Sequence, residues 1–335
     1  MKQFIQSLEK GGQSACVLGG KVLITPFGGR ILGLFPTPAK NLFWSDKSFL
    51  KDPAAFFAKD GWMNIGGDRT WIAPELDTNG NPNLPGYNVQ PSLDPGAYKI
   101  MSSSGSEVVM ESAMALDFKT AGVNVPLRLT KKVRLLNAPP VPVGQGVEYA
   151  GYELTVLLFA DAPLPNGVKP ETWNLVQVPG GGEIRIPVKK KTTPRGFIGK
   201  PVFKSLEKEV TASVDTDASF KFCIHADDSR GMMFYLNTND PAESTLVVRT
   251  FSVSPANSYS DVPGDGLDEL GYIQQIYIDA GALGGFGEME YHAPFICAER
   301  PTVADVSQLW GFAGPVDEMV KLMDELKNKE RSLWK

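Results

Sequence analysis

Two stretches of the chain combine ionisable and aromatic side chains at a spacing that could do chemistry. The first is 66–75, which reads Gly-Gly-Asp-Arg-Thr-Trp-Ile-Ala-Pro-Glu. Its Asp68, Arg69 and Glu75 can hydrogen-bond vicinal hydroxyls, while the face of Trp71 can pack on apolar C–H surface. The glycines let the backbone approach a ligand closely or adopt positive φ. These residue types suit a sugar; the alternative is a turn beside a core tryptophan.

The second stretch is 287–294, Gly-Glu-Met-Glu-Tyr-His-Ala-Pro. On a strand, alternation sends Glu288, Glu290 and His292 to one face. Three ionisable groups are costly to bury without partners, so this face is either exposed to solvent or lines a polar cleft. If it lines a cleft, we expect desolvation or Glu288 to raise the pKa of Glu290.

The chain has only one other histidine, His225. Alternation along 219–225 places Lys221, Cys223 and His225 on a single side, so this strand also carries polar groups where core residues are expected. Lys221 and His225 are therefore candidates for acid–base chemistry, as is His292.

Metal and cofactor sites are not predicted. Glu75, Asp261, Glu288 and Glu290 could supply oxygen ligands, but they share no short-range metal spacing. No cofactor motif is found in the sequence, so we expect no metal and no cofactor.

Composition describes an ordinary globular protein. The chain has 335 residues, of which 42% are hydrophobic and 21% charged, and its formal charge is −5. Without a long basic run there is no electrostatic footprint for nucleic acid or an anionic membrane, so neither partner is expected. The 34 glycines and 26 prolines favour many short strands joined by turns. The sequence leaves the oligomeric state open.

Targeting signals and a disulfide framework are also not evident. The chain has three widely separated cysteines, Cys16, Cys223 and Cys297, and this number and spacing indicate no disulfide framework. We expect them to behave as small buried hydrophobic residues. The N-terminal residues lack the apolar core of a signal peptide, and no segment approaches a transmembrane span. The chain as given is predicted to be cytoplasmic, although a trimmed signal peptide would leave the same sequence.

Period-two patterns predict an all-β antiparallel architecture. Strands are expected at 15–18, 21–25, 30–35, 149–159, 219–225, 232–236, 245–253, 272–278, 287–293 and 306–312. Strands are also expected within 98–136, where one period-two face carries Val108, Met110, Ser112 and Met114 and the next carries Leu127, Leu129, Lys131, Val133 and Leu135. A strand at 172–178 is expected to form a glycine hairpin with 183–188. The Asn-, Gly- and Pro-rich excursion at 77–97 is typical of a binding loop. Helical spacing in 316–329 predicts one amphipathic helix that faces the core or a dimer contact. We predict a single domain over 1–335 with a core at about 15–312.

The order of these motifs resembles the galactose mutarotase-like superfamily. The resemblance rests on the elements Gly29–Leu34, Gly66–Glu75, Thr172-Trp173 with Val178–Gly181, Tyr259–Asp261, and Glu288–Pro294 with Leu309-Trp310. More narrowly, it resembles a branch with a Gly-Gly-x-Arg-x-Trp-x-Ala-Pro-Glu element. It implies a large antiparallel β-supersandwich whose concave sheet holds a saccharide.

In aldose 1-epimerases of this superfamily, a late-strand glutamate is the general base, a mid-chain histidine the general acid, and an arginine helps bind the sugar. The resemblance implies that Glu290 is the base and that Arg69 binds the ligand. Thr172-Trp173-Asn174 occupies the neighbourhood of the family histidine. Two interpretations stay open: an epimerase-like isomerase in which Lys221, His225 or His292 replaces that acid, or a saccharide-binding module without turnover. A structural protein with no sugar site is the third. The predicted sugar contacts are Asp68, Arg69, Trp71, Glu75, Trp173, Asp261, Glu288 and His292.

Overall fold

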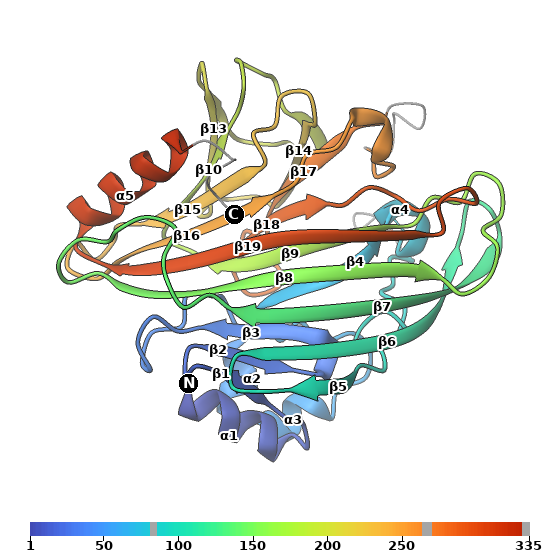
Figure 1. Ribbon diagram of the computed structural model, residues 1–335, viewed down its shortest axis with the longest axis horizontal. Coiled ribbons are helices and arrows are strands. Elements are labelled where there is room, and N and C mark those ends of the chain that lie inside the picture. The colour runs from blue at the N-terminus through green and yellow to red at the C-terminus, as the bar shows by residue number, and fades with distance from the viewer. Residues whose placement is uncertain (81–85, 263–269, 330–335) are drawn as a thin grey trace.

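Two large antiparallel sheets pack face to face and form most of the molecule (Figure 1). The structure, a computed structural model, describes residues 1–80, 86–262 and 270–329. The nine-stranded sheet has the order β1 (Cys16–Leu18), β2 (Val22–Thr25), β3 (Arg30–Leu34), β4 (Asp68–Ala73), β9 (Glu171–Pro179), β18 (Phe286–His292), β17 (Tyr272–Ile278), β14 (Phe220–His225) and β11 (Arg195–Ile198). The ten-stranded sheet has the order β12 (Lys204–Ser205), β13 (Glu209–Ser213), β10 (Glu183–Pro187), β15 (Met232–Asn237), β16 (Ser244–Phe251), β19 (Thr302–Gly314), β8 (Glu148–Ala160), β7 (Val123–Leu135), β6 (Glu107–Phe118) and β5 (Lys99–Ser103). The predicted all-β antiparallel class is confirmed.

Alternating side chains in the long strands build the core between the sheets. In β6 and β7 every second residue is buried, and the buried set includes Val108, Met110, Leu127 and Leu129. This is the period-two face that the sequence predicts, and it packs against the inner face of the nine-stranded sheet. The same inward face of β7 carries Lys131, which is fully buried. The core is therefore apolar with a few buried charged side chains inside it.

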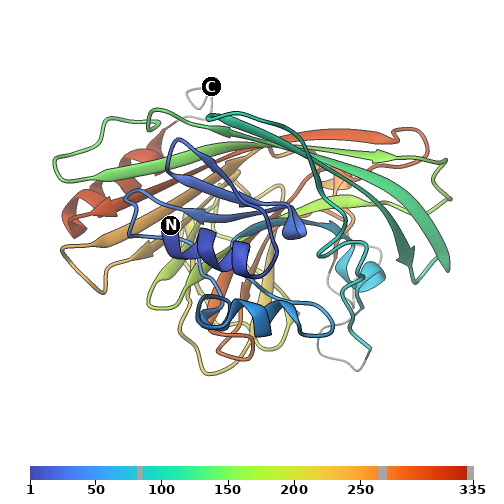
Figure 2. The same cartoon turned by 90° about the horizontal axis from the view of Figure 1, so that it is seen from below.

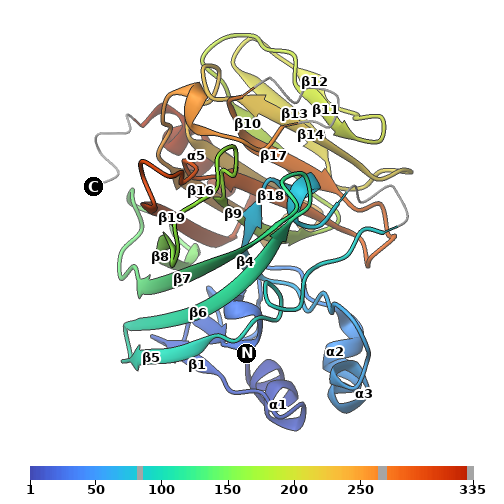
Figure 3. The same ribbon diagram turned by 90° about the vertical axis from the view of Figure 1, so that its right-hand side faces the viewer.

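The helices cover the outer surfaces of the sheets. The helix α5 (Val316–Asn328) buries Met319, Leu322, Met323 and Leu326 against β15, β16 and β19. The predicted helix at 316–329 is thus confirmed, and its apolar stripe faces the core. At the other end of the molecule, α1 (Lys2–Lys10), α2 (Lys47–Lys51) and α3 (Pro53–Phe57) lie together (Figures 2 and 3). They share an aromatic cluster with β2 and β3.

Three one-turn segments complete the described chain: α4 (Glu75–Thr78), η1 (Phe27–Gly29) and η2 (Ala256–Ser258). None of the helices within the described ranges is long and apolar enough to cross a membrane.

The segment that joins β9 to β10 differs from the prediction. The sequence predicts a glycine hairpin at 180–182, but β9 pairs with β4 and β18, whereas β10 pairs with β13 and β15. The glycine turn, with φ of +89° at Gly181, therefore carries the chain from one sheet to the other. A turn that joins two alternating segments specifies a reversal of direction but not which strand becomes the neighbour, and this explains the error.

Candidate active site on the nine-stranded sheet

Strand register gathers the predicted polar residues on one face of the nine-stranded sheet. Residues directly opposite each other in antiparallel strands share a face. Across β14, β17, β18 and β9 one such row is Lys221, Tyr277, Glu288 and Gln177. The next row is Cys223, Gln275, Glu290, Leu175 and Arg69, and a third contains His292, Trp173 and Trp71. Residues from distant parts of the chain therefore meet on the concave face, the one turned away from the ten-stranded sheet.

A cavity of about 400 Å³ opens on this face. Aromatic and charged side chains together make up most of its wall. The lining residues are Trp62, Arg69, Trp71, Glu75, Tyr87, Trp173, Ile198, Ser219, Lys221, Tyr277, Ala282, Leu283, Phe286 and Glu288. We call this cavity the concave-face pocket. The sequence predicts that the face with Glu288, Glu290 and His292 is either exposed to solvent or lines a cleft. All three side chains are buried, and Glu288 lines the cavity.

Two glycines position the strand that supplies one wall. Gly66 and Gly67 have φ of +100° and +84°, and a Cβ at these positions would lie 2.3 Å from the Trp44 carbonyl oxygen and 2.5 Å from that of Ile31. Only glycine fits such a close approach in the left-handed region. The glycines thus bring β4 tightly beside β3 and the segment around Trp44, and they fix where Arg69 leaves the sheet.

Arg69 lies between a carboxylate and two indoles. Its Nη2 donates to Glu288 Oε1 at 3.0 Å, and the same oxygen accepts from Gln177 Nε2 at 2.8 Å. The guanidinium lies 4.2 Å from the ring centre of Trp71 and 5.6 Å from that of Trp62. These contacts hold a planar cation by charge pairing and cation–π attraction.

Lys221 links two carboxylates. Its Nζ is 2.9 Å from Glu75 Oε2 and 2.9 Å from Glu290 Oε2, and it lies 4.2 Å from the ring centre of Trp173. Glu75 lines the pocket, whereas Glu290 lies behind Lys221 and Trp173 and is fully buried. The indole of Trp173 also donates to Glu290, at 2.5 Å.

The pKa values of this group follow its burial. Desolvation raises the pKa of Glu290 to about 8, although Lys221 opposes the shift; Glu288 and Glu75 add to it. This agrees with the expected direction for Glu290. The pKa of Lys221 is raised because the attraction of Glu290 and Glu75 outweighs the cost of burial. Lys221 therefore stays charged near neutral pH, whereas Glu290, with its pKa raised to about 8, titrates just above neutral pH.

A second buried layer lies behind the pocket. Glu171 Oε1 is 3.0 Å from His292 Nδ1, and Asp261 Oδ2 is 3.7 Å from His292 Nε2. Burial raises the pKa of Glu171 to about 8 and lowers that of His292 to about 4. Glu171 and His292 are therefore both neutral near pH 7, and their contact is not an ion pair.

This second layer supports the residues that meet the cavity. Asp261 Oδ1 accepts the backbone N–H of Glu75 at 2.9 Å, where the chain leaves β4 and enters α4. Glu171 in turn accepts the backbone N–H groups of Ser260 and Asp261, at 2.7 and 3.0 Å. His292 and Asp261, predicted as sugar contacts, are thus placed beneath the pocket wall.

Two predicted residues lie away from the pocket. Asp68 points from β4 to the opposite face of the sheet, because it neighbours Arg69 in an alternating strand. There it lies 3.2 Å from Arg249 and accepts from the hydroxyl of Tyr152. His225 follows a register shift at the end of β14, and its Nδ1 lies 3.6 Å from the exposed carboxylate of Asp227. Neither residue lines the cavity.

Several lining residues were not singled out in the sequence. Tyr277 lies opposite Glu288 and carried a period-two signal that could have identified it. Tyr87 comes from the excursion that was predicted as a binding loop. Trp62 lies outside any helix or strand, so no spacing pattern marks it.

The pocket rim at 279–285 is tied down by its own hydrogen bonds. The Asp279 carboxylate accepts the backbone N–H groups of Leu283 and Gly285, each at 2.9 Å. From the other side, the indole of Trp44 donates to the Gly284 carbonyl at 3.3 Å. Ala282 and Leu283, which line the pocket, are therefore held by contacts on both sides of the turn.

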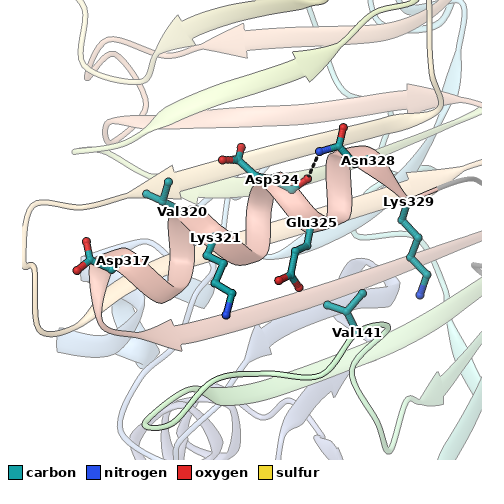
Figure 4. A pocket seen from close by; sticks show the side chains of 8 residues that line it. All are labelled: Val141, Asp317, Val320, Lys321, Asp324, Glu325, Asn328 and Lys329. Carbon is teal, nitrogen blue, oxygen red and sulfur yellow. Dashed lines mark hydrogen bonds between the residues drawn. The ribbon is translucent and has the colours of Figure 1, made fainter.

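A larger depression, of about 870 Å³, lies along the outside of α5 (Figure 4). It is lined by Val141, Val320, Lys329 and charged or amide side chains of α5, and none of the lining residues is buried. It has none of the converging charges or aromatic walls of the concave-face pocket. Among the described residues, no three His, Cys, Asp or Glu side chains are arranged to hold a metal ion.

Comparisons with known proteins support the fold. Neither a protein-family model nor a curated protein sequence matches the chain. Among solved structures, a proposed aldose 1-epimerase from Escherichia coli K12 matches with a TM-score of 0.51 and 12% identity, over 90% of this chain and 99% of that one. A protein from Synechocystis sp. PCC 6803 matches with a TM-score of 0.50 and 9% identity, over 88% and 91%. The chain therefore has the galactose mutarotase-like β-supersandwich fold that the motifs imply.

Proposed function

We propose that the chain binds a neutral saccharide in the concave-face pocket. The observation that carries this proposal is the alternation of paired charges and aromatic planes around one cavity. Carboxylates and a guanidinium suit the vicinal hydroxyls of a sugar, and indole faces suit its apolar C–H surface. The resemblance to the galactose mutarotase-like superfamily also implies a saccharide ligand, although a fold does not by itself define a function.

The charges in the wall favour a ligand without net charge. Two cations and two carboxylates line the cavity, and each cation lies within 3.0 Å of one of those carboxylates. An anionic sugar would have to compete with Glu288 for Arg69 or with Glu75 for Lys221. Binding would also require desolvation of the sugar's own charged group, which costs free energy. A neutral sugar can instead accept from one member of each pair and donate to the other.

Calorimetric titration tests this proposal. We expect D-galactose or another neutral aldose to bind, and D-galacturonate to bind more weakly. Glu288→Gln should weaken sugar binding by about 1 kcal/mol, because a charged acceptor becomes a neutral one. Glu153→Gln is the matched control, since Glu153 pairs with Arg134 on β7 and does not line the pocket. Absence of binding across a panel of neutral sugars would refute the proposal.

Interconversion of sugar anomers is a second candidate function, and Glu290 favours it. A general base works best when its pKa is near the operating pH, and burial raises that of Glu290 to about 8. In such a reaction the proton leaves O1, a proton reaches O5, and the C1–O5 bond breaks to give the open-chain aldehyde. Ring closure on the other face of C1 then gives the second anomer.

Lys221 is the candidate acid in this reaction. It lines the pocket and touches both Glu75 and Glu290. His225 lies at the end of β14 outside the pocket, and His292 is fully buried with its pKa lowered to about 4. Glu290 would need Lys221 or Trp173 to move before it could touch a sugar, because both separate it from the cavity.

Polarimetry separates the two candidates. If the chain is an isomerase, wild type accelerates mutarotation and Glu290→Gln lowers the rate by about 10²–10⁴-fold while binding persists. If the chain only binds sugar, wild type will not exceed the buffer rate. A rate that Glu290→Gln leaves unchanged would remove Glu290 as the base.

A further inference from the structure

Asp94 lies behind the pocket and contacts two of its aromatic walls at once. Its Oδ2 accepts from Trp62 Nε1 at 3.0 Å and from Trp71 Nε1 at 2.9 Å. The same oxygen accepts from Arg30 Nη2 at 2.6 Å. Both members of this ion pair are buried, at 0% exposure for Arg30 and 2% for Asp94. Three donors therefore converge on one carboxylate oxygen.

The arrangement is more than a buried ion pair. A guanidinium usually binds a carboxylate through two parallel hydrogen bonds. Here Arg30 uses its Nη1 for the Gly66 carbonyl at 3.1 Å, and within the described residues Asp94 Oδ1 has no hydrogen-bond donor. All three donors therefore converge on Oδ2, and none reaches Oδ1 within the described residues. The Arg30–Asp94 pair thus presents Asp94 Oδ2 to the two indole N–H groups.

Asp94 is itself held firmly. It lies in a turn at 91–97, and its backbone N–H donates to the Gln90 carbonyl at 3.1 Å. The side chain of Gln90 is tied to α4 and β6, through the carbonyl of Thr78 at 2.8 Å and the backbone N–H of Asp117 at 2.8 Å. Because Asp94 is fixed in this way, its carboxylate can orient the indole N–H groups that donate to it.

Of the two indoles, that of Trp62 depends more on Asp94 for its orientation. It lies between α3 and β4, outside any helix or strand, so no ladder of backbone hydrogen bonds fixes it. Its ring meets that of Trp71 edge to face, with centres 5.4 Å apart, and Trp71 meets Trp173 in the same way at 5.4 Å. The Arg69 guanidinium lies over both Trp62 and Trp71. Turning either indole would move this cation.

We propose that Asp94 is a positioning residue of the pocket: its carboxylate, held by Arg30, fixes the indoles of Trp62 and Trp71 and, through them, Arg69. The consequence for ligand binding rests on the proposed saccharide function, whereas the orientation of the indoles does not. Asp94 itself does not line the cavity.

Indole N–H resonances provide the direct test. In ¹H–¹⁵N spectra of the unliganded protein, Trp62→Phe and Trp71→Phe assign the two signals among the six tryptophans. We expect both wild-type signals to lie downfield and to exchange slowly with solvent. In Asp94→Asn at least one should move upfield and exchange at least about 10-fold faster, because the charged acceptor is lost.

Asp68→Asn is the matched control, because Asp68 also pairs with a buried arginine but contacts neither indole. It should lose stability and leave the indole signals in place. For D-galactose, Asp94→Asn should raise Kd about 10-fold, by analogy with the loss of affinity when a hydrogen-bond partner that orients a metal ligand is removed. Asp68→Asn should leave Kd unchanged.

Each remaining outcome decides the question. Unmoved indole signals in Asp94→Asn, or an equal rise of Kd in Asp68→Asn, would overturn the proposal. If Asp94→Asn does not fold, the wild-type exchange rates decide, since a Trp62 N–H that exchanges like a free indole is not held by Asp94. If wild type binds no D-galactose, the saccharide proposal is weakened for that sugar, and the indole signals alone judge the role of Asp94.

Discussion

Strand β4 sends adjacent charged residues into two different environments. Asp68 enters the core between the sheets, where it pairs with Arg249 at 3.2 Å. Arg69 enters the concave-face pocket, where it pairs with Glu288 at 3.0 Å. Burial does not distinguish the two pairs, because all four side chains are almost inaccessible to solvent.

The two pairs differ in what surrounds them. The Asp68–Arg249 pair is closed in by Tyr152, which donates to Asp68, and by Tyr291, over whose ring Arg249 lies at 4.8 Å. The Arg69–Glu288 pair instead borders a cavity. Unused donors do not separate the pairs, because Nε and Nη1 lack a hydrogen-bond acceptor in both Arg69 and Arg249 within the described residues. A buried charge is therefore weak evidence for a site. A buried charge pair that borders a cavity with aromatic walls is much stronger evidence.

The largest effect is expected from the pair between the sheets. Arg249→Met should lower the free energy of unfolding by about 3–5 kcal/mol, because it leaves Asp68 buried without its counter-charge. Urea denaturation measures this loss. Sugar affinity of the fraction that stays folded should not change. A large loss of affinity with little loss of stability would reverse the roles that we assign to the two pairs.

The pocket pair should show the opposite pattern. Arg69→Ala should weaken sugar binding by about 1.5–3 kcal/mol, since it removes charged hydrogen-bond donors. Lysine should not restore the affinity, because it lacks the planar fork that stacks on Trp71. Titration calorimetry of both variants, with circular dichroism to verify folding, measures the effect. Full affinity in a folded Arg69→Ala protein would exclude Arg69 from the site.

The layer behind the pocket is predicted to make stability depend on pH. Burial raises the pKa values of Glu171 and Glu290 from 4.5 to about 8, so between these values the folded chain binds protons that the unfolded chain has released. The free energy of unfolding should therefore fall as pH rises from 6.5 to 8, by at most about 1.4 kcal/mol per pH unit for each carboxyl.

Burial lowers the pKa of the Met1 amino group from 8.0, so this group opposes the slope near the upper end of the window. Two other groups act mainly outside it. The lowered pKa of His292 acts between about 4 and 6.5, with the opposite sign, because there the unfolded chain binds the extra proton. The pKa of Lys131 is lowered to about 8, so it acts mainly above the window. Glu171→Gln should reduce the slope by about half in denaturation experiments at pH 6.5, 7.0 and 7.5. An unchanged slope would mean that Glu171 is ionised in the folded protein.

The smallest effect is expected at the depression along α5. Val320 is 39% exposed there and contacts no part of the concave-face pocket. Val320→Ser should change both sugar affinity and stability by less than about 0.5 kcal/mol. Competition between sugar and a ligand of this surface, or a marked loss of affinity in Val320→Ser, would move the binding site to α5.

Local patterns were enough to predict much of this architecture. Period-two alternation identified β14, β17 and β18, and with them the faces that carry Lys221 and Glu288. The spacing of Met319, Leu322 and Met323 identified α5. In α5 the signal is strong because one face is buried over the whole length of the helix. In β14 and β18 both faces are largely buried, and the alternation separates apolar core side chains from the polar side chains of the pocket face.

Other features depend on which strands become neighbours, which alternation does not specify. Asp68 and Arg69 are adjacent and similarly polar, and only the orientation of β4 decides which of them meets the pocket. Glu290 shares a face with Glu288 but lies one row deeper, behind Lys221 of β14. The contact of Asp94 with Trp62 joins two irregular segments, for which no periodic signal exists.

The tied turn at 279–285 has a consequence for the kinetics of binding. Because Asp279 and Trp44 hold this part of the rim in place, a sugar should enter the pocket without waiting for the turn at 279–285 to open. In stopped-flow measurements of tryptophan fluorescence, the observed rate should then rise linearly with sugar concentration and reach no plateau. The lifetime of the complex would be determined by how quickly the sugar breaks its own contacts and leaves.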